Sequence, residues 1–192
     1  NEVAFGTIGD ASTSEGVFWE TVNAAGVLQV PMALSVWDDG YGISVPKKYQ
    51  TTKESISDAL SGFEKTEDSN GIKIYKVNGW DYPNLIITYE KAIDFCRKNH
   101  VPVLIHVENI TQPQGHSTSG SHERYKSKER LEWAKQYDCV TKFKEWILSN
   151  DNALNEPLSS IEELDEIESQ VKAEVRSEAK KAWSDFNSIL GK

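Results

Sequence analysis

Apolar runs of strand length alternate with segments of helical periodicity along the first half of the chain. The apolar runs stand at 2–8, 31–36, 71–77 and 101–107. Between them, apolar residues recur every three or four positions at 15–28, 53–64 and 82–98, which predicts helices with one apolar face. Alternating strands and helices are typical of a parallel sheet with right-handed crossovers. We therefore expect an α/β fold with helices on both faces of a parallel sheet.

The individual strands and connections carry further information. The almost continuously apolar segment 2–8 predicts a buried parallel strand. Segment 71–77 (GIKIYKV) alternates between apolar and polar residues, which predicts a strand that is half exposed or near an edge of the sheet. Residues 40–53 contain two glycines and a proline, so we expect a long loop there.

The composition changes after the fourth strand. Residues 108–128 are polar and rich in Gly and Ser, and a loop of that length is usually functional or disordered. Helical periodicity returns at 129–149, and Ser160 with Glu163 forms a capping box that predicts a last helix. We expect an α/β core at 1–128 with an active-site loop at 108–128. The C-terminal helices at 129–192 are expected to pack on this same domain.

Composition and charge narrow the class of protein. The 192 residues carry a net charge of −9, which argues against a nucleic-acid partner. No apolar run approaches the ~20 residues of a membrane span, and no signal peptide is visible, so we expect no membrane association. Cys96 and Cys139 lack metal-ligand or disulfide spacing. We read both as unreactive thiols in a reducing compartment, which predicts a cytoplasmic protein.

The start of the chain is abrupt. Asn1 stands where a natural chain would have Met, and a core strand follows within a few residues. We therefore expect a piece of a longer protein whose α/β core is incomplete at its N-terminus.

The chemistry-bearing residues follow the first two strands. Asp10 ends the first strand and is followed by small residues and a helix start. Backbone N–H groups of Ala11 and Ser12 could approach an anion there, helped by the helix dipole. Asp38 and Asp39 end the next strand. Because parallel strands present their carboxyl ends at the same edge, this pattern predicts a ligand site between them.

A carboxylate beside an anion site requires a cation between the two. Magnesium prefers oxygen ligands, so Asp10, Asp39 and a backbone carbonyl near Tyr41 predict a magnesium–phosphate site. Taken singly, Asp10 is more simply a helix N-cap and 38–40 a turn. The spaced pair favours the site.

The same segments resemble a known motif. GDASTSEG at 9–16 and DDGYGIS at 38–44 resemble the two halves of the thiamine-diphosphate motif, in the form found in alpha-type subunits of 2-oxo acid dehydrogenases. The likeness continues in GIKIYKVNGWD at 71–81 and PVLIHVENITQPQGHSTSG at 102–120, and it covers essentially the whole chain. The resemblance implies the diphosphate domain of the thiamine-diphosphate-binding fold, with thiamine diphosphate and Mg²⁺ as cofactors.

The resemblance also implies roles for individual residues. Asp10, Asp39 and the main-chain oxygen of Tyr41 correspond to metal ligands. His116 corresponds to the active-site histidine that reaches the diphosphate and the reacting centre, and Ser117 to a serine phosphorylated in some relatives. The cofactor-binding positions are Gly9, Asp10, Ala11, Ser12, Asp39, Tyr41, Ile43 and His116.

Two departures from the family pattern change the expected chemistry. Ala11 replaces the usual Gly, which requires a backbone φ below zero at this position. Asp38 and Asp39 replace two Asn residues. A second carboxylate should attract magnesium more strongly but repel the diphosphate.

The remaining histidines have simpler interpretations. We expect His106, within an apolar strand, to be a core or rim residue with satisfied hydrogen bonds, and His100 to lie on the surface at a helix end. His122 is equally compatible with the active-site loop and with a solvated loop.

The resemblance implies an activity and partners as well. The implied reaction is the oxidative decarboxylation of a 2-oxo acid, with acyl transfer to a lipoyl-bearing acyltransferase. The HSTS sequence at 116–119 favours branched-chain 2-oxo acids over pyruvate as substrates. The pyrimidine-binding part belongs to a beta-type subunit or a fused domain, so we expect a homo- or hetero-oligomer and an inactive isolated chain. Alternatives are a transketolase-like enzyme and a non-catalytic assembly module. A nucleotide-binding domain is disfavoured because GxGxxG and GxxxxGK[ST] are absent.

Overall fold

The computed structural model describes residues 2–114, 122–149, 152 and 154–191. The chain divides into two compact units, Asn1–Phe143 and Lys144–Lys192.

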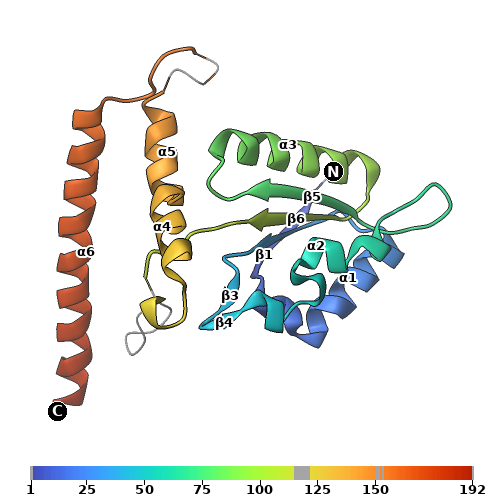
Figure 1. The fold of residues 1–192 in the computed structure, drawn as a ribbon, viewed down its shortest axis with the longest axis horizontal. Helices are drawn as coiled ribbons and strands as arrows, with labels where there is room; N and C mark the ends of the chain where they lie inside the picture. Colours follow the sequence, from blue (N-terminus) through green and yellow to red (C-terminus); the bar gives the residue numbers. More distant parts are fainter. Residues whose placement is uncertain (1, 115–121, 150–151, 153, 192) are drawn as a thin grey trace. The chain divides into compact units, whose positions relative to one another are not determined.

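The first unit is built on a four-stranded parallel sheet (Figure 1). Its order is β1 (Ala4–Gly9), β2 (Met32–Trp37), β6 (Val103–Glu108) and β5 (Lys73–Asn78). In the register, Gly9 pairs with Trp37 and Trp37 with Val107, so these strands end at the same edge. The predicted strands and their parallel arrangement are confirmed.

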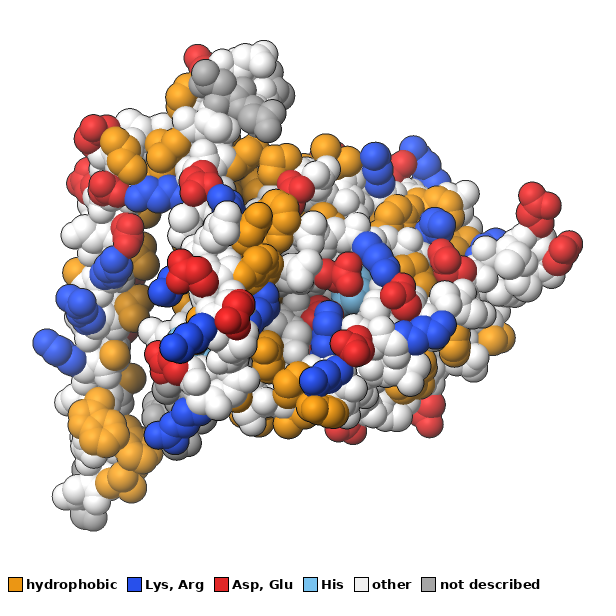
Figure 2. Space-filling view, viewed as in Figure 1, with side chains coloured by type: hydrophobic (Ala, Val, Ile, Leu, Met, Phe, Trp, Pro, Cys, Tyr) orange, Lys and Arg blue, Asp and Glu red, His pale blue; other side chains and the backbone are white. Residues whose placement is uncertain are grey.

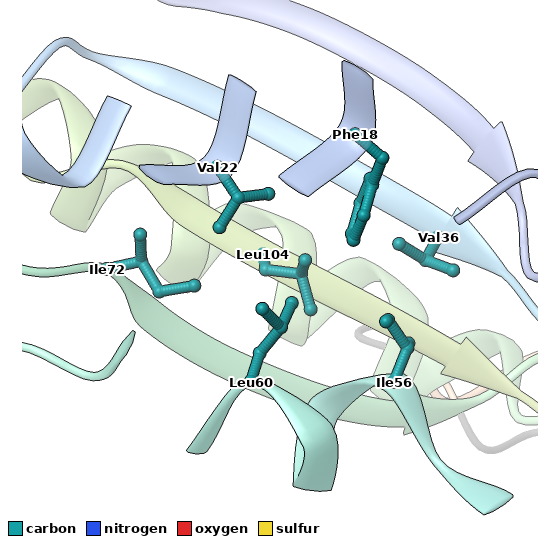
Figure 3. Packing of buried hydrophobic residues seen from close by; sticks show 7 residues of the cluster. All are labelled: Phe18, Val22, Val36, Ile56, Leu60, Ile72 and Leu104. Carbon is teal, nitrogen blue, oxygen red and sulfur yellow. The ribbon is translucent and has the colours of Figure 1, made fainter. Parts of the chain in front are cut away.

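Helices cover both faces of this sheet, as predicted (Figure 1). On one face lie α1 (Gly16–Leu28) and α2 (Ile56–Ala59), whose apolar side chains meet those of the strands. That cluster contains Phe18, Val22, Val36, Ile56, Leu60, Ile72 and Leu104 (Figure 3). On the other face lies α3 (Tyr82–Asn99). Its Ala92 and Cys96 pack on the opposite side chains of β2, β5 and β6.

The burial expected for residues 2–8 was wrong. β1 lies at an edge of the described sheet, and its Phe5 is 53% exposed. The reason is that α3 packs over β2, β5 and β6, which leaves one face of β1 largely uncovered within the described residues. The edge position predicted for 71–77 is confirmed by β5.

The helix predicted at 53–64 was also wrong as a continuous element. It is divided into η3 (Thr52–Glu54), the four-residue α2 and η4 (Ser61–Phe63). Lys53 and Glu54 have φ values of 59° and 54°, which breaks the helix, and Ser55 then caps α2 by accepting a hydrogen bond from Asp58 N at 3.3 Å. The predicted apolar face was right, since Ile56 and Leu60 are buried.

The predicted loop at 40–53 contains short elements. A small antiparallel hairpin joins β3 (Tyr41–Gly42) to β4 (Val45–Pro46), and η2 (Lys47–Tyr49) follows it. Between β1 and α1, the 3₁₀ turn η1 (Ala11–Ser14) begins directly at the end of the first strand.

The helical prediction for 129–149 corresponds to two helices. These are α4 (Lys128–Gln136) and α5 (Cys139–Ile147), preceded by η5 (His122–Arg124). The Asp138 carboxylate causes the break by accepting a hydrogen bond from Thr141 N at 2.8 Å. Trp80 after β5 packs against Tyr137, at 5.0 Å between ring centroids, which places α4 on the first unit.

The last helix, α6 (Ile161–Leu190), belongs to the second unit. Ser160 caps it as predicted by accepting a hydrogen bond from Glu163 N at 3.2 Å. Hydrophobic side chains gather near its carboxyl end (Figure 2). The expected packing of 129–192 on the core stays a prediction. Among the described helices, none combines the length and the apolar composition needed to cross a bilayer.

Candidate functional site

A cavity of about 390 Å³ opens at the carboxyl ends of β1 and β2. Its lining residues are Gly9, Asp10, Ala11, Ser12, Trp37, Asp39, Tyr41, Gly42, Ile43, Ile110 and Gln112. Every described residue that the sequence singled out for cofactor or metal binding is among them. His116 and Ser117 lie outside the described residues, so their roles stay predictions.

Hydrogen bonds of its backbone hold Asp10 in place at the end of β1. Its N–H donates to the Trp37 carbonyl at 3.0 Å, and its carbonyl accepts from Thr13 N at 3.1 Å and Thr13 Oγ1 at 2.5 Å. The side chain of Asp10 is buried. Burial, together with the charges of Asp38 and Asp39, raises the pKa of Asp10 to about 7. The site thus concentrates negative charge in a place of low solvation.

Asp38 and Asp39 are adjacent, yet they have different surroundings. The buried carboxylate of Asp38 accepts hydrogen bonds from Gly40 N at 2.7 Å and from Lys47 Nζ at 2.8 Å. It also lies 3.0 Å from His106 Nε2. Burial alone would raise its pKa, but the hydrogen bonds from His106 and Lys47 lower the pKa to about 2. Asp38 therefore braces the turn, while Asp39 lines the cavity.

His106 connects this turn to the core, and the prediction of a satisfied core histidine is confirmed. It is fully buried, and its Nδ1 lies 2.8 Å from Ser57 Oγ. Asp38, His106 and Glu108 lie close enough to suggest a second metal set. However, the Lys47 ammonium already occupies the Asp38 carboxylate, and its charge opposes a metal ion there.

The β3–β4 hairpin forms one wall of the cavity through a close approach at Gly42. A Cβ at Gly42 would lie 2.9 Å from Ala11 Cβ, so only glycine lets the hairpin pack on η1. Ala11 itself is not among the residues with positive φ, which meets the condition set for replacing the usual glycine. Ile43 has φ 58° and is 65% exposed, a strained state for a β-branched residue.

Two cations beside the site were missed by sequence reasoning. Arg130 Nη2 donates to the Asp39 carbonyl at 3.1 Å. Lys126 is buried, and its Nζ lies 4.9 Å from the centroid of the Tyr41 ring. Both residues belong to the segment around the start of α4, far from Asp39 in sequence, and no motif marked them. Trp37 could have been found, since it stands at the end of a predicted strand.

Comparisons with known proteins agree with this geometry. The family model described as "Dehydrogenase E1 component" matches residues 1–188. The pyruvate dehydrogenase E1 component subunit alpha of Acholeplasma laidlawii is 31% identical over 187 residues, which cover 96% of this chain and 50% of that protein. The corresponding subunit of Rickettsia bellii is 28% identical over 163 residues, or 85% of this chain and 47% of that protein.

A plant relative carries a different substrate in its name. The mitochondrial 2-oxoisovalerate dehydrogenase subunit alpha 2 of Arabidopsis thaliana is 31% identical over 144 residues, which cover 74% of this chain and 29% of that protein. The chain thus spans half or less of the length of these curated relatives. Because the family model extends over nearly all of its residues, the chain belongs to the dehydrogenase E1 component family.

Proposed function

We propose that this chain holds the diphosphate and magnesium ion of thiamine diphosphate in an enzyme that oxidatively decarboxylates a 2-oxo acid. One observation carries the proposal. Asp10 and Asp39, from the ends of neighbouring parallel strands, line the same cavity as the small residues that begin η1. Family membership supports thiamine diphosphate as the cofactor.

The donor set fits a hydrated divalent cation. Magnesium is usually bound by one or two carboxylates together with phosphate oxygens. Burial, followed by the neighbouring carboxylates of Asp38 and Asp39, raises the pKa of Asp10, and a divalent cation would offset the repulsion among these carboxylates. In this proposal Asp10, Asp39 and the main-chain oxygen of Tyr41 hold the metal. Gly9, Ala11, Ser12 and Ile43 adjoin the cofactor.

The cofactor and the residues of this chain have different roles in the proposed reaction. Thiamine diphosphate, when bound, supplies the stabilisation of the carbanion that decarboxylation requires. The residues of this chain anchor and orient the diphosphate end, and the Asp38 network keeps the turn that carries Asp39 in place. His116 is proposed to reach the diphosphate and the reacting centre.

The whole enzyme requires partners in this proposal. These are a pyrimidine-binding subunit or fused domain and a lipoyl-bearing acyltransferase, in an oligomer. The family match favours the dehydrogenase over the transketolase-like alternative. The names of relatives include both pyruvate and 2-oxoisovalerate, and we keep branched-chain 2-oxo acids as the proposed substrate class. Free Cys96 and Cys139 support the proposed reducing, cytoplasmic compartment.

Calorimetric titration tests the proposal. Thiamine diphosphate should bind this chain only when Mg²⁺ is present, and Asp10→Asn should weaken that binding by at least about tenfold, or about 1.4 kcal/mol. The matched control is Asp94→Asn, whose carboxylate is 53% exposed on α3. It should leave binding unchanged.

The opposing result is equally clear. If neither the chain nor a longer form that includes the pyrimidine-binding part binds thiamine diphosphate with Mg²⁺, the cofactor role is wrong. The non-catalytic assembly module would then be the better interpretation.

A further inference from the structure

Lys126 is an unusual lysine because it is buried and has no ion pair within the part of the chain that the structure describes. Its side chain is 8% exposed, although lysines are almost never fully buried unless paired. Its Nζ lies 4.9 Å from the ring centroid of Tyr41 and 5.9 Å from that of Tyr125. Among the described residues, no carboxylate lies within the 4.0 Å of a salt bridge from it. Two aromatic rings therefore hold the ammonium group.

The chain around Lys126 fixes this position. Lys126 N donates to the His122 carbonyl at 2.9 Å, which closes a turn before α4. Ser127 then caps α4 by accepting from Arg130 N at 3.2 Å. Arg130 in turn donates to the Asp39 carbonyl and lies 4.0 Å from the Trp133 ring centroid. The start of α4 is thus attached to the turn that carries Asp39.

The charges around the site are unequally matched. Lys47 forms an ion pair with Asp38 at 2.8 Å, so the Asp38 carboxylate already balances its charge. Asp10 and Asp39 would together neutralise one magnesium ion. The negative charge of a diphosphate then remains, and Lys126 and Arg130 are the cations that the structure places beside Asp39 and Tyr41. The charge of Asp39 favours the protonated form of Lys126 and so opposes the lowering of its pKa by burial.

We propose that Lys126 is a built-in counter-charge of the cofactor cleft, which allows a diphosphate to bind beside the Asp39 carboxylate. This inference rests on the proposed function and extends it to a residue outside the cavity lining. Lys126 is a positioning and charge-balancing residue here, since it acts through the Tyr41–Asp39 turn. The Lys126 charge should therefore strengthen the binding of an anion and weaken the binding of a cation.

Opposite signs separate this role from a structural one. Removing the positive charge should weaken the binding of an anion but should not weaken the binding of Mg²⁺, which the ammonium repels. A residue that only stabilised the turn would support both ligands, and its loss would weaken both.

The experiment compares calorimetric titrations of the whole chain with MgCl₂ alone and with inorganic diphosphate or thiamine diphosphate at saturating Mg²⁺. Lys126→Met should weaken both diphosphate ligands by about tenfold while Mg²⁺ binds as before or more tightly. Lys126→Arg should stay within about threefold of the wild type, because it keeps the charge. Lys135→Met is the matched control, since Lys135 is 76% exposed on α4.

A double variant provides a further check. In an Asp39→Asn background, Lys126→Met should weaken diphosphate binding by less than it does in the wild type. The reason is that the Asp39 carboxylate, whose negative charge Lys126 is proposed to offset, is then absent. Thermal unfolding checks that each variant folds, and Lys126→Gln replaces Lys126→Met if the latter does not.

Several outcomes would overturn the inference. Loss of Mg²⁺ and diphosphate binding together in the charge-removing variant would assign Lys126 a structural role, and unchanged binding of both would assign it none. Either result leaves the proposed function standing if the wild type binds thiamine diphosphate with Mg²⁺. Failure of the wild type to bind would overturn both.

Discussion

At the scale of single residues, Asp38 and Asp39 show how neighbouring carboxylates acquire different tasks. The Asp38 side chain points inward to Gly40 N, Lys47 and His106, and the hydrogen bonds from His106 and Lys47 lower its pKa. Its carboxylate is therefore ionised at neutral pH and paired with Lys47. Its charge still helps to raise the pKa of Asp10, so the repulsion expected from a doubled aspartate comes from both Asp38 and Asp39.

Asp10 has the opposite behaviour, which leads to a prediction about pH. Its native pKa of about 7 exceeds the value of about 4 for an unfolded chain. Between these values the native state binds more protons than the unfolded state, so Asp10 makes the free energy of unfolding fall as pH rises. Above the native pKa, Asp10 lowers the free energy of unfolding by its full amount. Each unit of pKa difference corresponds to about 1.4 kcal/mol.

Urea unfolding across this pH range measures the effect. Asp10→Asn should remove this decline and gain stability relative to the wild type as pH increases, in buffers without Mg²⁺. Asp94→Asn serves as the exposed control and should follow the wild type. A constant difference between Asp10→Asn and wild type at all pH values would contradict the prediction.

At the scale of elements, regular segments were predictable and breaks were not. The sheet strands, α1, α3 and α6 follow from periodicity because each presents a continuous apolar pattern. The segment 53–64 has the same pattern, but left-handed backbone at Lys53 and Glu54 and the cap at Ser55 divide it. Asp138 divides 129–149 in the same way. Local hydrogen bonds to short polar side chains override periodicity at such positions.

The site was predictable to a similar degree. Strand ends and turns are local in sequence, so Asp10, Asp39 and their neighbours could be placed together. Lys126 and Arg130 reach the site only through tertiary packing. Lys47 pairs with Asp38 because the chain turns back after residue 40, and no sequence motif predicts that turn. The burial of β1 was misjudged because its nearly continuous apolar pattern, unlike the alternating pattern of β5, did not indicate a strand at an edge of the described sheet.

The β3–β4 hairpin supports a prediction of its own. Ile43 has a left-handed backbone, which costs a β-branched residue about 1–2 kcal/mol. Ile43→Gly should remove that strain, and after the greater entropy of the unfolded glycine chain the net gain in stability should be up to about 1 kcal/mol. Thermal unfolding would measure it. Val45→Gly is the control and should destabilise, because Val45 in β4 has no positive φ.

The same variant separates fold from function. Ile43 lines the cavity, so Ile43→Gly should weaken thiamine diphosphate binding while it stabilises the protein. A loss of stability would show that the hairpin tolerates Ile43 without strain.

At the scale of the whole molecule, we propose that the chain supplies one side of the cofactor site. It spans half or less of the length of its relatives, and the cavity at the sheet edge is open. We predict that the chain alone, with thiamine diphosphate, Mg²⁺ and a branched-chain 2-oxo acid, releases no carbon dioxide above background. The reason is that the proposed enzyme needs the pyrimidine-binding part, which we expect in a beta-type subunit or a fused domain.

Carbon dioxide release is the measurement. Addition of the pyrimidine-binding partner should restore it, and Asp10→Asn in the reconstituted enzyme provides the inactive control. Decarboxylation by the chain alone would show that this chain already contains a complete active site.

The contact between Ala11 and Gly42 has a consequence for how the chain can vary. A Cβ at position 42 would clash with Gln50 Nε2 and would lie 2.9 Å from Ala11 Cβ, so these two side chains fill the space beside Gly42. A methyl group at position 42 would therefore require glycine at position 11 and a displaced Gln50 side chain, and a larger side chain at position 42 would separate the two walls of the cavity. Positions 11, 42 and 50 constrain one another sterically. Variant libraries of this motif should change them together.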